Sequence, residues 1–79
     1  MNLDQARRMI GENVAARRKE LGMTQVALAR AVGISQPAIV AIEKGKISPS
    51  LETLLALADA LQTTLSGLTT PGIFSGSPA

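Results

Sequence analysis

The side chains that catalyse most hydrolytic and metal-dependent reactions are missing from this chain of 79 residues. It contains no Cys and no His, so it has no thiolate nucleophile, no imidazole base and no Cys- or His-bound zinc. A reaction would have to rely on Ser, Thr, Lys and six carboxylates. Each plausible one of these has a simpler role as a helix cap, an anion contact or a structural group. We therefore predict that the chain is not an enzyme and needs no metal or other cofactor.

Basic side chains could still bind an anionic partner, and they are confined to the first part of the chain. All eight basic residues precede residue 47, namely Arg7, Arg8, Arg17, Arg18, Lys19, Arg30, Lys44 and Lys46. Four acidic residues also precede it, so residues 1–46 carry a net charge of +4, whereas residues 47–79 carry −2. Such a basic half favours a polyanionic partner, although an ordinary solvated helical surface explains it equally well.

Hydrophobic periodicity predicts that helices position these charges. Apolar residues recur at helical spacing over residues 3–21, 25–32, 36–44 and 51–61, and a short fifth helix follows at 65–68. The expected N-caps of the last four helices are Thr24, Ser35, Ser50 and Thr64. No segment has strand periodicity, and no signal peptide or membrane span is apparent. We expect an all-α, compact five-helix bundle in the cytoplasm.

One charged residue lies at the edge of a predicted buried face. Arg18 follows Val14 by four residues and precedes Leu21 by three, so its guanidinium needs a carboxylate partner. Glu43 follows Ile39 by four residues and flanks the inner face of the third helix. These two helical phases predict a structural salt bridge between Arg18 and Glu43.

Residues 21–45 carry the pattern LGMTQxxLAxxxGISQxxIxxIEKG, and residues 49–61 continue it with PxLxxLxxLAxAL. This resembles the Cro/C1-type (XRE) helix-turn-helix of the phage repressors over roughly residues 14–68. The resemblance implies a lambda-repressor-like DNA-binding fold with its helix-turn-helix at residues 25–44. We accordingly place one DNA-binding domain at residues 1–68 and a flexible tail at 69–79.

In that family the third helix lies in the major groove of DNA, and the resemblance implies the same here. If Ile39, Ile42 and Glu43 face inward, the outer positions are available to bases. We predict base contacts from Ser35, Gln36, Pro37, Val40 and Ala41. Gln36 suits an adenine edge, and the three apolar residues suit thymine methyl groups. The simpler alternative is that Gln36 is an ordinary first-turn residue.

The DNA backbone needs a second set of contacts. We predict phosphate contacts from Thr24, Gln25, Lys44 and Lys46. In the resemblance, Thr24, Lys44 and Lys46 match family positions used for the backbone. Gln25 begins the second helix, where N–H groups and the helix dipole favour an anion. Arg17, Lys19 and Arg30 are as consistent with surface charge as with phosphate contact.

A single helix-turn-helix reads only a short half-site, so we expect a homodimer on a palindromic operator. The fourth helix buries Leu51, Leu54, Leu55, Ala58 and Leu61 in this interpretation. That leaves Leu57 on another face, and we take Leu57, Leu65 and Leu68 as candidates for the dimer interface. The alternative for each is the core of the monomer. Ile73 and Phe74 are apolar residues in an otherwise small and polar tail.

The function that follows is sequence-specific recognition of double-stranded DNA by a transcriptional regulator, most simply a repressor. Two alternatives stay open, and the first is favoured by the small size of the chain, its apolar tail residues and the few polar residues on the outer face of the third helix. One is an antitoxin-like module that binds a protein partner such as a toxin and also autoregulates its operon. The other is the DNA-binding part of a longer regulator whose sensor domain is absent.

Overall fold

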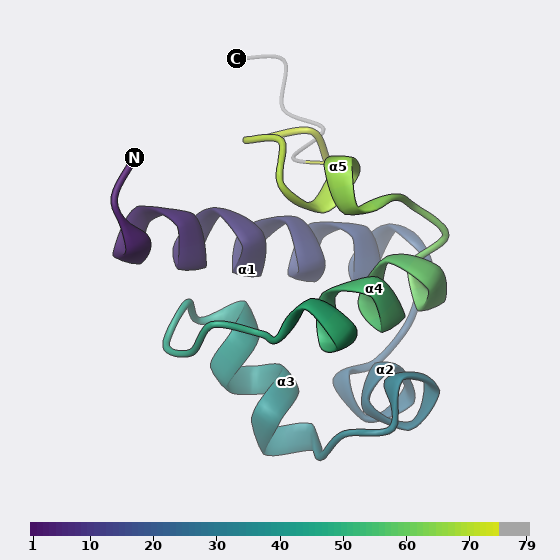
Figure 1. Cartoon of the computed structure of the whole chain (residues 1–79). Helices are drawn as coiled ribbons and strands as arrows, with labels where there is room; N and C mark the ends of the chain where they lie inside the picture. The colour runs from purple at the N-terminus through teal and green to yellow at the C-terminus, as the bar shows by residue number, and fades with distance from the viewer. Residues whose placement is uncertain (75–79) are drawn as a thin grey trace.

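The structure, a computed structural model, describes residues 1–74, and over that range it contains helices and no strands. Figure 1 shows their arrangement: a long first helix crosses the molecule, the second and third lie on one side of it, and the fifth lies on the other. The five helices are α1 (Leu3–Glu20), α2 (Gln25–Val32), α3 (Gln36–Glu43), α4 (Leu51–Ala60) and α5 (Leu65–Leu68). The predicted all-α fold is confirmed.

Each helix begins at a side chain that accepts a hydrogen bond from its first turn. The hydroxyls of Thr24, Ser35, Ser50 and Thr64 accept from the backbone N–H three residues later, as the sequence predicts. Asn2 caps α1 in the same way, and the Gln5 side chain completes a reciprocal capping box. Local sequence therefore sets the point at which every helix starts.

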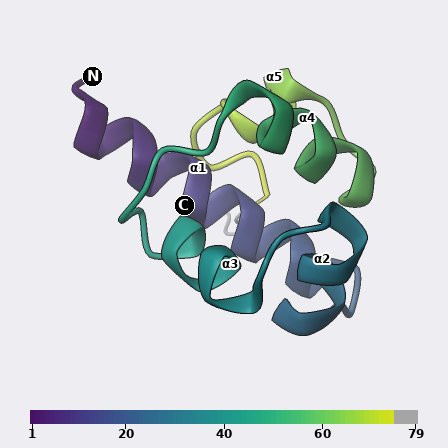
Figure 2. The same ribbon diagram turned by 60° about the horizontal axis from the view of Figure 1, so that its bottom comes forward.

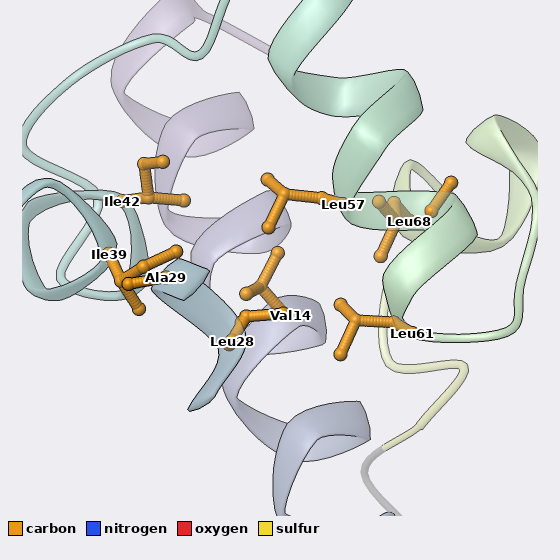
Figure 3. Packing of buried hydrophobic residues seen from close by; sticks show 9 residues of the cluster. Val14, Leu28, Ala29, Ile39, Ile42, Leu57, Leu61 and Leu68 are labelled. Carbon is orange, nitrogen blue, oxygen red and sulfur yellow. The ribbon is translucent and has the colours of Figure 1, made fainter. Parts of the chain in front are cut away.

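The core forms where α1, α2, α3, α4 and α5 converge, and it consists of aliphatic side chains (Figure 3). Its buried members are Val14, Leu28, Ala29, Ile39, Ile42, Leu57, Ala58, Leu61 and Leu68. Full burial of each large aliphatic side chain contributes about 1.5–3 kcal/mol, so this cluster is the main source of stability. It fixes α2 and α3 against α1 and α4.

The predicted buried face of α4 is partly wrong. Leu57 is completely buried, whereas Leu51 and Leu55 are 62% and 51% exposed. The helix is rich in leucine on all sides, so its periodicity admits more than one inner face, and packing against α2 and α5 selects the one that contains Leu57 and Leu61. Leu57 and Leu68 thus belong to the monomer core and are not available for a dimer interface. Leu65 is half-buried.

The structured part of the chain continues beyond the domain boundary predicted at residue 68. Asn13, a buried side chain of α1, donates from Nδ2 to the carbonyl oxygens of Leu68 and Thr70, both at 2.9 Å. Phe74 packs against the core, and its ring centroid lies 5.5 Å from Cζ of Arg17. Residues 69–74 are therefore folded onto α1, and the rest of the predicted tail, 75–79, lies outside the described residues.

Candidate nucleic-acid interface

Helices α2 and α3 form a helix-turn-helix. Gly33 follows α2 with φ +82°, a left-handed conformation that costs glycine little and bends the chain sharply. The axes of the two helices differ in direction by 108°, within the range of helix-turn-helix units. In Figure 2 the two helices come forward side by side at the end of the molecule away from α5. This places α3 where another molecule can reach its outer face.

The length and composition of the helices also decide whether one of them could cross a membrane. Among residues 1–74 no single helix has the length and apolar composition to cross a bilayer. Only α2 and α3 taken together meet those criteria, with the sharp bend between them.

The outer face of α3 presents the residues for which we predict base contacts. Ser35, Gln36 and Pro37 are exposed, and Val40 and Ala41 are half-buried, whereas Ile39 and Ile42 are buried on the opposite face. Gln36 forms no side-chain hydrogen bond among the described residues, so its whole amide is free to bind a ligand. The hydroxyl of Ser35 already accepts from the N–H of Ala38 at 3.2 Å, which leaves its proton for donation.

An ion pair fixes both ends of this unit to α1. Arg18 donates from Nε to Oε2 of Glu43 at 2.7 Å and from Nη2 to Oε1 at 3.1 Å. The side chains are only 11% and 8% exposed, so the bidentate pair lies in a largely water-free environment. A third Arg18 bond reaches the carbonyl oxygen of Met23 at 2.9 Å, between α1 and α2. The pair that the two helical phases predict is present.

Gln25 extends the same network. Its Nε2 donates to Oε1 of Glu43 at 3.1 Å, so one carboxylate joins the start of α2, the end of α3 and the last turn of α1. An amide nitrogen carries two hydrogens, and the second is available for an anion next to the N-terminus of α2. Thr24 is exposed beside it, with its hydroxyl oxygen accepting from Ala27.

The basic residues divide into structural and exposed groups. Arg18 is committed to Glu43, and Arg17 donates to the carbonyl oxygen of Leu61 at 2.9 Å, at the end of α4. Lys44 and Lys46, which the sequence predicts as phosphate contacts, are exposed directly after α3 and form no ion pair among the described residues. The packing also brings Arg7 and Arg8 to this end of α3. Sequence reasoning assigned those two no role, because the proximity depends on how α1 crosses the bundle.

Comparison with known proteins agrees with this geometry. The family HTH_3, described as helix-turn-helix, matches residues 14–68. The chain belongs to this helix-turn-helix family. Over 54 residues it is 46% identical to repressor protein C2 of Salmonella phage P22, covering 68% of this chain and 25% of that protein. Over 44 residues it is 52% identical to an HTH-type transcriptional regulator of Methanothermobacter thermautotrophicus, covering 56% of this chain and 64% of that protein.

Solved structures of helix-turn-helix proteins have the same fold. The solution structure of the P22 c2 repressor DNA-binding domain matches with a TM-score of 0.80 and 39% identity, covering 98% of this chain and 95% of that one. The crystal structure of the P22 c2 repressor in complex with a synthetic operator matches with a TM-score of 0.75 and 42% identity, covering 78% and 94%. The lambda-repressor-like fold and the resemblance to phage repressors are thereby confirmed. The chain nevertheless spans only a quarter to about two thirds of the curated relatives named above.

Proposed function

We propose that the chain is a DNA-binding transcriptional regulator, most simply a repressor, whose α3 enters the major groove of an operator. The observation that carries this proposal is the free amide of Gln36 at the exposed start of a helix held rigidly by the Arg18–Glu43 pair. The structural relative that was solved on a synthetic operator supports the same arrangement. The phosphate contacts come from Thr24, Gln25, Lys44 and Lys46, which border α3. Such a regulator would act in the cytoplasm.

Selection from a random duplex pool followed by a Gln36→Ala variant tests this proposal. Loss of a bidentate amide contact to adenine should weaken binding to the selected site by about 1–3 kcal/mol. The same variant should bind an unrelated duplex as tightly as the wild type, since phosphate contacts carry that affinity. Equal loss on both duplexes would indicate general damage to the domain, and unchanged affinity on the selected site would refute base recognition by Gln36.

The apolar residues Pro37, Val40 and Ala41 imply that thymine methyl groups are read as well. Replacing individual thymines of the selected site with uracil removes only the C5 methyl group. We expect binding to weaken at the positions under α3 and not in the flanking sequence, which is the matched control. If no thymine-to-uracil replacement weakens binding, these side chains do not face thymine methyl groups.

We infer that the chain acts as a homodimer on a palindromic site, because one α3 reads only a few base pairs. Of the three leucines predicted for the interface, only half-buried Leu65 remains available. The exposed Leu51 and Leu55 provide further apolar surface on α4. Sedimentation with and without the selected duplex tests the stoichiometry: two chains per duplex are expected, and one chain on a non-palindromic site would contradict the dimer.

Copurification of a second polypeptide that displaces DNA would instead favour the antitoxin-like alternative.

A further inference from the structure

The first two turns of α1 lie beside the chain that leaves the proposed recognition helix. In Figure 1 the N-terminal half of α1 runs next to the end of α3 and the loop that follows it. This loop, residues 44–50, connects α3 to α4 and carries Lys44 and Lys46. Two arginines of α1, Arg7 and Arg8, face it.

Two glycines make this approach unusually close. A Cβ atom on Gly45 would lie 2.8 Å from Cγ and 2.9 Å from Cα of Arg8. A Cβ on Gly11 would overlap the carbonyl oxygens at the end of α3, at 2.7 Å for that of Glu43. The backbone of α1 and the end of α3 therefore touch where only glycine fits, which fixes the backbone of Arg8 beside Gly45, the residue between Lys44 and Lys46.

The guanidinium of Arg7 is bound to a later residue of the same loop. Its Nε donates to the hydroxyl of Ser48 at 2.7 Å, and Nη1 lies 3.4 Å from Asp4, a mostly exposed carboxylate. Arg8 has no ion pair and no side-chain hydrogen bond among the described residues. Of the acidic groups near this surface, Glu43 is committed to Arg18, and Asp4 and the exposed Glu12 lie four residues before and after Arg8 on α1. Arg7, Arg8, Lys44 and Lys46 therefore outnumber the two exposed carboxylates on this part of α1.

We propose that Arg7 and Arg8 bind phosphates of the operator backbone and extend the contact of the α3–α4 loop onto α1. The proposal rests on the function proposed above, since duplex DNA is the polyanion that α3 would bring to this surface. A guanidinium suits a phosphate because it donates two parallel hydrogen bonds. Arg7 is preorientated by Ser48, and Arg8 has all its donors available. These contacts position the protein on DNA without reading sequence.

The salt dependence of binding measures these contacts directly. The variants are Arg7→Gln, Arg8→Gln and the double variant, which keep the Cβ and Cγ methylene groups, among them the Cγ of residue 8 beside Gly45. Lys19→Gln is the matched control, since Lys19 is an exposed cation near the other end of α1. Each phosphate contact adds about 0.9 to the slope of log affinity against log salt. Between 50 mM and 200 mM salt, each variant should therefore lose about 3.5-fold less affinity than the wild type, and the double variant about 12-fold less.

The controls separate this inference from the function on which it rests. Far-UV circular dichroism and thermal melts should show that the three single variants and the double variant remain folded. Binding to the selected and unrelated duplexes should weaken equally in Arg7→Gln and Arg8→Gln, in contrast to Gln36→Ala. If Lys19→Gln changes the slope as much as they do, or if they leave it unchanged, the α1 contact is refuted while the regulator remains. If the wild-type chain binds no duplex at any of these salt concentrations, both proposals fail.

Discussion

Removal of one partner of the Arg18–Glu43 pair should destabilise the protein far more than removal of both. The two side chains are almost enclosed, with 11% and 8% of their surfaces exposed, so a guanidinium or carboxylate left alone would lose its partner without regaining water. Breaking a buried pair in this way costs about 3–5 kcal/mol. Arg18→Met and Glu43→Leu should each lower the free energy of unfolding by about that amount. In a domain of this size that corresponds to a fall in melting temperature on the order of 15 °C or more.

The double variant provides the decisive comparison. With both charges replaced by apolar side chains, the desolvation cost of the pair disappears along with its attraction. The double variant still lacks two hydrogen bonds, the one that Arg18 donates to the carbonyl oxygen of Met23 and the one that Gln25 donates to Glu43. Each of these is worth about 1 kcal/mol. We therefore expect the double variant to be within about 2 kcal/mol of the wild type, and more stable than either single variant.

Urea unfolding followed by circular dichroism gives all four free energies, and their cycle gives the coupling between the residues. A coupling energy of at least about 2 kcal/mol is expected for a bidentate pair in this environment. Two results would refute the view that the pair is buried and holds α1 to α3. One is that the effects of the two single substitutions simply add, and the other is that each costs less than about 1 kcal/mol, as is usual for an exposed pair.

Three further predictions test the packing. Leu57→Ala should cost about 2–5 kcal/mol in urea unfolding, whereas Leu55→Ala, at a position 51% exposed, should stay within about 1 kcal/mol; similar costs would contradict the observed face of α4. Asn13→Ala leaves two carbonyl oxygens without their donor and should cost about 1–3 kcal/mol, with faster amide hydrogen exchange in residues 69–74 as its local signature. Gly11→Ala should lower the melting temperature although alanine favours helices, because its methyl group meets the carbonyl oxygen of Glu43; a stabilised variant would show that α1 and α3 are less close than described.

The parts of the fold that are predictable from the sequence are those determined by neighbours along the chain. Thr24, Ser35 and Gly33 act on the backbone within three or four residues, so the bounds of α2 and α3 follow from them. The Arg18–Glu43 pair is also predictable, because two helical phases independently place a charge at the edge of the core. The inner face of α4 is not, since its leucines surround the helix and only tertiary packing distinguishes Leu57 from Leu55. The proximity of Arg8 to Gly45 and the anchoring of residues 69–74 by Asn13 likewise depend on distant segments.

The position of the helix-turn-helix is determined by α1 more than by the turn itself. Gly33 sets the bend between α2 and α3, but a turn alone leaves both helices free to shift as a unit over the core. The buried side chains of Leu28, Ile39 and Ile42 oppose such a shift. The Glu43 carboxylate, on the last residue of α3, adds to this because it accepts from Arg18 on α1 and from Gln25 on α2. The contact of Gly11 with the end of α3 fixes the same point from the other side. Since α1 also carries Arg7 and Arg8, one rigid helix would align the base-reading face and its backbone contacts. Substitution of Arg7, Arg8 or Arg18 should then alter DNA affinity although none of these residues is expected to touch a base.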